Sequence, residues 1–239
     1  VADLTDAGIE IKPATQLTQV KDNGEKVTLY YQQGDQTNTA EFDAVLVAVG
    51  RRPNISSLGL ENTDIALTNR GAIQVDDHLR TTVQNIWALG DVNGGPMFTY
   101  VSLDDFRIVK AALSGGSYTD TGRNIPYSVF IEPSLSRVGL TEKEAREQKY
   151  DIAVASLPAA AIPKAHVLQH PQGLLKAIVD RKTGKILGAA LFCVESYEMI
   201  NIIKLAMDAG LPYTALRDQI FTHPTMSEAL NDLFGRIQL

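Results

Sequence analysis

The residues best suited to chemistry lie near the end of the chain, in residues 221–228 (FTHPTMSE). His223 precedes a proline, and Glu228 stands five residues after His223. This spacing allows an imidazole to be held on a rigid turn with a carboxylate behind it, which is the arrangement of a general base. Two alternatives stay open. A lone histidine is more often structural, and residues 225–228 also form a capping box in which Glu228 only caps its helix.

A second group of candidates surrounds an apolar, strand-like run at residues 85–91. Gly90 and Asp91 close this run and open a glycine-rich loop, and a helix is predicted from Thr99 to Leu113. In a doubly wound fold, ligands bind at the carboxyl ends of strands, where Asp91 could accept a hydrogen bond from a ribityl or ribose hydroxyl. The first amides of the helix would favour an anionic ring or phosphate there. The alternatives are a turn or cap role for Asp91 and an ordinary packing helix.

A third candidate follows residues 43–50 (DAVLVAVG), a nearly continuous apolar run that predicts a central strand buried on both faces. Gly50 would allow the backbone to approach a ligand closely. Arg51 and Arg52 come next, and this motif by itself favours the alternative that they are solvated loop charges.

Composition excludes several classes of protein. The 239 residues suffice for one or two domains, and the net charge of -6 argues against nonspecific binding to nucleic acid or to an anionic membrane. No apolar run is long enough to span a bilayer, so we expect a cytoplasmic protein. The single cysteine, Cys193, excludes an internal disulfide and a cysteine-based zinc cluster, and its apolar surroundings predict a buried, inert thiol. The histidines show no metal-ligand spacing, so no metal site is expected.

The elements that would position these residues change character along the chain. Strand-like pieces at 9–12, 26–31 and 39–42, separated by turns, predict an antiparallel meander. After a linker near residues 115–123, strands and helices alternate: strands at 127–131 and 137–139, a capped helix from 141, a hairpin of 174–180 with 185–193, and helices at 195–210, 213–219 and 225–234. The prediction is a mixed α/β and α+β protein.

Together, these segments resemble the pyridine nucleotide–disulfide oxidoreductases, a family that includes dihydrolipoamide dehydrogenase, glutathione reductase and mercuric reductase. The matching stretches occur in family order: AVLVAVGRRPN at 44–54, IWALGDV at 86–92, RVGLTE at 137–142, GKILG at 184–188 and HPTMSE at 223–228. Residues 90–95 and 98–107 are further similar to a bacterial subgroup tied to reactive-chlorine resistance and hypothiocyanous acid reduction.

The resemblance implies FAD and NAD(P)H as cofactors and a role for each candidate. Gly90 and Asp91 would meet the FAD ribityl chain, and Phe98 and Thr99 would face the pyrimidine end of the flavin. Gly50 and Arg51 would lie where the chain crosses from the nicotinamide-binding domain to the FAD domain. His223 would manage thiol protons with Glu228 orienting it, in the active site of the partner subunit of a homodimer. The bond between His223 and Pro224 would be cis.

The same resemblance divides the chain into three parts. Residues 1–48 would be the C-terminal part of an NAD(P)-binding domain, residues 49–117 the C-terminal segment of an FAD-binding domain, and residues 118–239 the dimerisation domain. The family's CxxxxC redox pair and its two GxGxxG turns are not in this sequence.

These departures predict a C-terminal fragment of an FAD- and NAD(P)H-dependent oxidoreductase that reduces a small-molecule disulfide or oxidant. We expect such a fragment to be inactive and to bind no cofactor by itself. The alternative is a stand-alone dimerisation or binding module. A flavoenzyme without thiol chemistry is a third option, against which His223 argues.

Overall fold

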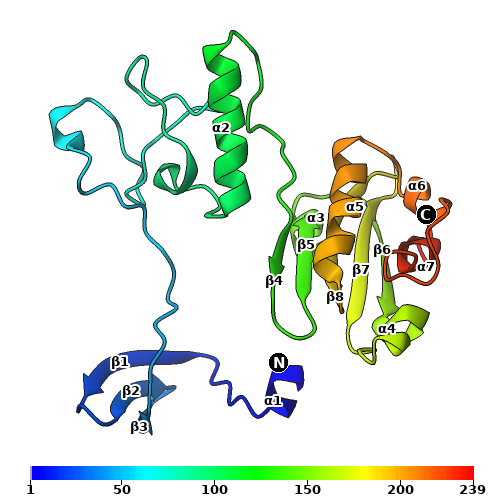
Figure 1. Ribbon diagram of the computed structural model, residues 1–239, viewed down its shortest axis with the longest axis horizontal. Coiled ribbons are helices and arrows are strands. Elements are labelled where there is room, and N and C mark those ends of the chain that lie inside the picture. Colours follow the sequence, from blue (N-terminus) through cyan, green and yellow to red (C-terminus); the bar gives the residue numbers. More distant parts are fainter. Residues whose placement is uncertain (1) are drawn as a thin grey trace. The chain divides into compact units, whose positions relative to one another are not determined.

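The computed structural model describes residues 2–239, with side chains from residue 4 onward, and divides into two compact units, Val1–Arg52 and Pro53–Leu239 (Figure 1). The first unit contains helix α1 (Ala2–Asp6) and strands β1 (Thr15–Asp22), β2 (Val27–Gln33) and β3 (Gln36–Phe42). These strands form an antiparallel sheet in sequence order, so the predicted meander is confirmed. Residues 9–12, predicted as a strand, are irregular, and β1 starts later.

The prediction of a buried central strand at residues 43–50 is wrong. This run has no regular structure, and Leu46, Val47 and Val49 are 91%, 72% and 88% exposed. A central strand needs a paired neighbour on each edge for its backbone N–H and C=O groups. No strand among residues 2–239 pairs with this run, so its apolar sequence has no sheet to join.

The second unit begins with long loops that lead to a single helix. Two 3-10 turns, η1 (Leu60–Asn62) and η2 (Gly90–Asn93), precede helix α2 (Thr99–Leu113), whose predicted bounds are confirmed. The strand predicted at 85–91 is wrong, because this part holds only the isolated bridges Leu67↔Ile73 and Arg80↔Trp87. Each bridge closes a short local turn, and no third strand extends the pairing.

The rest of the chain forms a five-stranded antiparallel sheet with helices on both faces. The sheet order is β4-β5-β8-β7-β6, so the predicted hairpin of β7 and β8 supplies two adjacent central strands. The elements are β4 (Tyr127–Val129), β5 (Leu135–Gly139), α3 (Glu142–Glu147), β6 (Ile152–Pro158), η3 (Ala159–Ala161), α4 (Pro163–Val167), β7 (Leu174–Asp180), β8 (Ile186–Phe192), α5 (Ser196–Asp208), α6 (Thr214–Arg217) and α7 (Ala229–Gly235).

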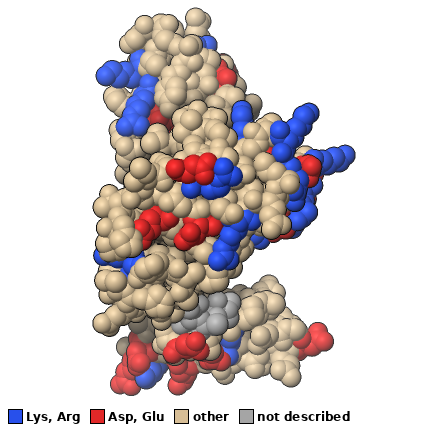
Figure 2. Space-filling model, turned by 90° about the vertical axis from the view of Figure 1, so that its right-hand side faces the viewer, with Lys and Arg blue, Asp and Glu red and all other residues tan. Residues whose placement is uncertain are grey.

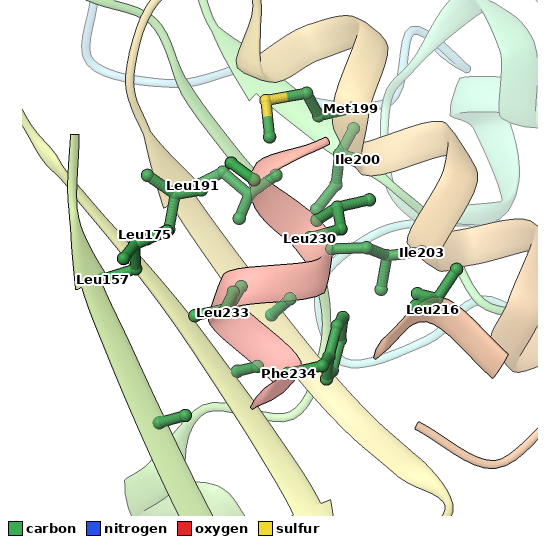
Figure 3. Close-up of a cluster of buried hydrophobic side chains, with 14 of the residues drawn as sticks. Leu157, Leu175, Leu191, Met199, Ile200, Ile203, Leu216, Leu230, Leu233 and Phe234 are labelled. Carbon is green, nitrogen blue, oxygen red and sulfur yellow. The ribbon is translucent and has the colours of Figure 1, made fainter. Parts of the chain in front are cut away.

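The main core lies between this sheet and helices α5 and α7 (Figures 1 and 3). Figure 3 shows Leu233 and Phe234 of α7 beside sheet residues and the α5 side chain of Ile203. The opposite face carries α3, whose Ala145 packs on Ile152 and Ile178 in a smaller cluster. The predicted capping box starts α3, because the Thr141 side chain accepts from the Glu144 amide and the Glu144 carboxylate accepts from the Thr141 amide.

The predicted mixed fold with antiparallel sheets is therefore confirmed. Among residues 2–239, no helix has the length and apolar character needed to cross a membrane. Figure 2 shows one face of the molecule, on which Lys and Arg side chains gather at the right-hand margin with Asp and Glu among them. The charges at that margin are mixed in sign.

Candidate functional site

The His223–Glu228 pair lies in the turn between α6 and α7. His223 Nδ1 is 2.8 Å from Glu228 Oε2, so the predicted contact between imidazole and carboxylate forms. The Glu228 amide also donates to Thr225 Oγ1 over 3.3 Å, which is one half of a capping box. The carboxylate that would complete the box turns to His223 instead. The peptide bond between His223 and Pro224 is cis, as predicted.

This geometry determines which nitrogen of the ring can exchange a proton. An ionised carboxylate only accepts hydrogen bonds, so Nδ1 carries the hydrogen and Nε2 is the nitrogen left for a substrate. The His223 side chain is 72% exposed, whereas that of Glu228 is only 19% exposed. Glu228 Oε1 is buried without a hydrogen-bond partner among the described residues. The pair is therefore a held carboxylate that presents an accessible imidazole.

Asn231 fixes the turn that carries this pair. Its side-chain amide donates to the carbonyls of Leu216, Arg217 and Gln219 over 2.8, 2.9 and 3.1 Å. These bonds tie the end of α6 to α7, while Ala229 and Leu230 of α7 are buried in the main core. Sequence reasoning did not identify Asn231, although an Asn that follows two apolar residues at the start of a helix, just after a turn, is a usable signal.

Gly90 lies where the backbone turns closely against α2. Its φ is +73°, and a Cβ there would lie 2.9 Å from Ser102 Oγ. Its amide donates to Asp105 Oδ2 over 2.9 Å, and Asn93 Nδ2 donates to the same oxygen over 3.1 Å. Glycine is therefore required by the φ and by the contact with α2.

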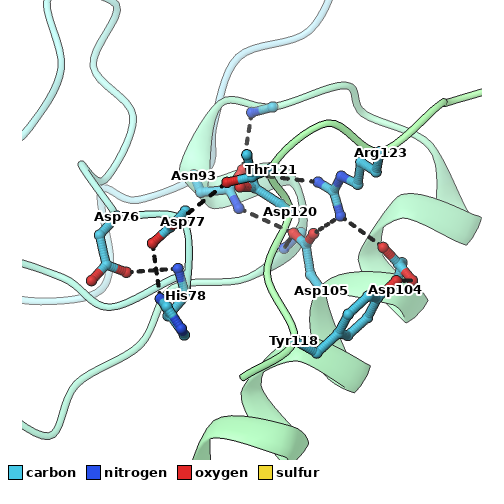
Figure 4. A network of polar contacts seen from close by, with 12 residues as sticks. Asp76, Asp77, His78, Asn93, Asp104, Asp105, Tyr118, Asp120, Thr121 and Arg123 are labelled. Carbon is cyan, nitrogen blue, oxygen red and sulfur yellow. Dashed lines mark hydrogen bonds and ion pairs between the residues drawn. The ribbon is translucent and has the colours of Figure 1, made fainter. Parts of the chain in front are cut away.

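Asp105 is the centre of a polar network that connects three segments (Figure 4). Besides Gly90 and Asn93, its carboxylate accepts from Arg123 Nη1 over 2.7 Å, and Arg123 also donates to Asp104 over 3.1 Å. Burial acts to lower the pKa of Arg123, but the hydrogen bonds to Asp105 and Asp104 more than offset it, so the pKa is raised. Sequence reasoning missed Asp105. The available signal was an acidic residue on the same helical face as Val101 and Ile108.

Asp91, Phe98 and Thr99 lie around the start of α2, which packs against η2. Phe98 is the N-cap residue but supplies no side-chain cap, and the first turn has no acidic residue. The Phe98 ring stacks on Tyr127 at 5.8 Å between centroids. Asp91 is exposed, and its side chain has no hydrogen bond among the described residues. The helix start and the Asp91 carboxylate are thus available to a ligand.

Gly50 and Arg51 lie just before the end of the unit Val1–Arg52. Gly50 has a φ of +107°, which only glycine adopts readily, and no described atom lies within 4 Å of the position of a Cβ. The ligand-binding role of these two residues stays a prediction. Likewise, no described contact joins the His223–Glu228 pair to Asp91 or Phe98.

Cys193 is fully buried, as predicted. Burial, with a smaller contribution from the charge of Glu195, raises the pKa of its thiol to about 12. Such a thiol is protonated near neutral pH and is a poor nucleophile.

Asp76, Asp77 and His78 offer ligand atoms within 4.8 Å of one another, although the sequence predicted no metal site. Asp77 accepts from His78 Nδ1 at 2.8 Å, and Asp76 accepts from the amides of His78 and Arg80 (Figure 4). These hydrogen bonds within the turn explain why the three side chains lie close together.

Two family models match the chain. The model described as "Pyridine nucleotide-disulphide oxidoreductase" matches residues 2–105, and the model of the "Pyridine nucleotide-disulphide oxidoreductase, dimerisation domain" matches residues 125–234. Among curated proteins, the "Probable pyridine nucleotide-disulfide oxidoreductase RclA" of Escherichia coli (strain K12) is 52% identical over 98% of this chain and 53% of its own length. The dihydrolipoyl dehydrogenase of Mycobacterium tuberculosis (strain ATCC 25618 / H37Rv) is 35% identical over 95% of this chain and 49% of its own.

Solved structures agree with these matches. The HOCl-induced flavoprotein disulfide reductase RclA from Escherichia coli superimposes with a TM-score of 0.89 at 52% identity, covering 98% of this chain and 53% of that one. LpdA from Mycobacterium tuberculosis gives a TM-score of 0.90 at 23% identity, covering 98% and 51%, which shows the shared fold. The chain spans about half the length of the curated relatives that it matches.

Proposed function

Because this chain belongs to the pyridine nucleotide-disulphide oxidoreductase family, we propose that it supplies the proton-handling base and the subunit interface of an FAD- and NAD(P)H-dependent disulfide oxidoreductase. The observation that carries this proposal is the His223–Glu228 pair, whose Nδ1 and carboxylate lie 2.8 Å apart with the imidazole exposed.

In this proposal, Nε2 of His223 takes a proton from a thiol and returns it to a leaving thiolate. Glu228 holds Nδ1–H and stabilises the imidazolium that forms in between. The thiols belong to residues outside this chain, because its one cysteine is buried and the pKa of its thiol is raised to about 12. The exposed imidazole is accessible to thiols on another segment or subunit.

The residues around α2 fit one side of a flavin. FAD, when bound, supplies electron transfer between the nicotinamide and the disulfide. Asp91 would accept a hydrogen bond from a ribityl hydroxyl beside Gly90, and the uncapped start of α2 at Phe98 and Thr99 would direct amide donors at the pyrimidine ring. The sequence has no GxGxxG turn for the pyrophosphate, so we expect the chain alone to retain neither FAD nor NAD(P)H.

The parts of the chain are assigned accordingly. Residues 1–48 would belong to an NAD(P)-binding domain, residues 49–117, including Gly50 and Arg51, to an FAD-binding domain, and residues 118–239 to the interface domain of a homodimer. The dimerisation-domain match at residues 125–234 supports the last assignment. The substrate would be a small-molecule disulfide or oxidant in the cytoplasm, with no nucleic-acid or membrane partner.

The decisive test uses the longer protein in which this chain accompanies the flavin- and thiol-bearing half of the family fold. His223→Gln should lower steady-state disulfide reduction by about 10²- to 10⁴-fold, the usual contribution of a general acid–base group. Flavin reduction by NAD(P)H, followed by stopped flow, should stay near wild type. His170→Gln, at an exposed histidine 3.7 Å from Glu132, is the matched control. Wild-type disulfide turnover by His223→Gln would refute the proposal, as would NAD(P)H-dependent turnover by this chain alone.

A stand-alone dimerisation module is the second candidate. The observation that favours it is the large core cluster, whose buried residues all lie between Val138 and Ile237, in the five-stranded sheet and the segments packed against it. A His223→Gln variant of the longer protein with unchanged kinetics, together with a stable dimer of the chain by sedimentation, would support this alternative.

A further inference from the structure

A groove of about 650 Å³ lies between α3 and the part of the sheet face that α3 leaves uncovered. This face is opposite the one that packs against α5 and α7. The volume of the groove is within the range of small-molecule sites, about 300–1,000 Å³. The residues that line it are Arg137, Leu140, Thr141, Glu142, Lys143, Arg146, Glu147, Lys176, Ile178, Ala189 and Ala190.

Strand register places two cations on either side of a small residue in this groove. Ala190 of β8 pairs with Arg137 of β5 on one side and with Lys176 of β7 on the other. Paired residues of adjacent strands point to the same face, and strands lie about 4.8 Å apart, so the Cα atoms of Arg137 and Lys176 are about 10 Å apart. The alanine methyl group leaves open space between the two long side chains.

The charges around the groove favour an anion. Four cationic side chains line it (Arg137, Lys143, Arg146 and Lys176), together with the carboxylates of Glu142 and Glu147, in a chain whose net charge is -6. With Glu144, which lies 3.5 Å from Arg137, the cations exceed the carboxylates by one. Glu142 alone contacts both Lys176 and Arg146, so it neutralises only part of their charge.

Arg137 is the cation with the most unused hydrogen-bonding capacity. Its described contacts are a 3.5 Å ion pair with Glu144 and a position 5.7 Å from the Tyr127 ring centroid. A guanidinium has five N–H donors in a fork that matches a carboxylate. Arg137 is thus half-buried with donors left for a ligand.

The floor of the groove is apolar, with Leu140 and Ile178 beside Ala190. An inorganic anion would leave that surface uncovered, whereas a purely apolar ligand would leave the cations unpaired. We propose that the groove binds a small organic acid, with its carboxylate between Arg137 and Lys176 and its apolar body on Leu140 and Ile178. This site is additional to the proposed redox function and does not depend on it.

Titration of the isotope-labelled chain by NMR tests the proposal, with benzoate as the probe. Phosphate serves as the head-group control and benzyl alcohol as the apolar control. Benzoate should bind about tenfold more tightly than either and shift the amide signals of β5, β7 and β8. Arg137→Gln and Lys176→Gln should each weaken benzoate about tenfold, as expected for the loss of a hydrogen bond to a charged group. Lys182→Gln, in the exposed β7–β8 turn, should change nothing.

Ala190→Leu tests the space between the two cations without altering charge. It should abolish benzoate binding while circular dichroism and the thermal midpoint stay near wild type; if it misfolds, the two Gln variants decide. Equal affinity for benzoate and phosphate, or equal effects of Arg137→Gln and Lys182→Gln, would overturn the proposal. So would binding to this chain that disappears in the longer protein, because the groove would then be a packing surface for another segment.

Discussion

Replacing Asp105 by Asn should destabilise the unit Pro53–Leu239 by about 3 kcal/mol, the low end of the cost of breaking a buried ion pair. Asp105 is 1% exposed and accepts from Gly90, Asn93 and Arg123. An amide of the same size keeps one acceptor oxygen but turns an N–H₂ group toward one of these donors. Arg123, with 16% of its side chain exposed, loses its shortest ionic partner. Because Arg123 keeps Asp104 as a partner at 3.1 Å, we expect a loss of stability at the low end of the range for a broken buried ion pair.

The assay is urea unfolding followed by tryptophan fluorescence. Trp87 is the one tryptophan of the sequence and stands three residues before Gly90, so its signal reports on the segment that the network holds. Asp104→Asn is the matched control: it removes a less buried partner of Arg123 and should cost about 1 kcal/mol or less. A loss below about 0.5 kcal/mol in Asp105→Asn, or equal losses in the two variants, would refute the reasoning.

Three further outcomes are expected. Cys193, whose pKa is about 12, should react with a thiol reagent at pH 8 only when the chain is unfolded in urea, and fast labelling of the native chain would contradict its burial. Thr141→Ala should cost about 1 kcal/mol at neutral pH; the Thr141 backbone amide and then its hydroxyl lower the pKa of Glu144, and the variant removes only the hydroxyl, so the part of the cost that comes through Glu144 is present above the ordinary pKa of 4.5 and should be lost as pH falls through the lower folded-state pKa in urea titrations. Gly173→Ala should cost about 3 kcal/mol or more in thermal unfolding, because φ is +119° and a Cβ would lie 1.8 Å from Phe192 O, whereas Gly235→Ala, with open space, should be near neutral.

The sequence predicts the elements that depend on local signals. Helix α2 has buried residues at Val101, Asp105 and Ile108, the spacing of one helical face, and its predicted bounds match. The hairpin of β7 and β8 is marked by apolar strands around a Lys-Thr-Gly turn. The contact of His223 with Glu228 was equally local, since five residues separate them.

Features that depend on contacts between residues far apart in the sequence could not be predicted in the same way. Residues 43–50 and 85–91 have the composition of buried strands, but composition does not say whether a neighbouring strand exists to pair with them. Asp105 contacts Gly90 across 15 residues and Arg123 across 18, and no short motif records such a network. The groove between Arg137 and Lys176 likewise follows from a strand order that places β8 between β5 and β7.

The division of the chain at Arg52 has a practical consequence for protease digestion. Trypsin cleaves after Arg51 but poorly after Arg52, because Pro53 follows it, and both arginines lie exposed in an irregular segment. A brief digestion should therefore separate the two compact units at one bond. The exposed apolar residues Leu46, Val47 and Val49 would leave with the smaller product. The larger product would retain Asp91, Asp105, the five-stranded sheet and the His223–Glu228 pair. It would lack the exposed apolar residues Leu46, Val47 and Val49.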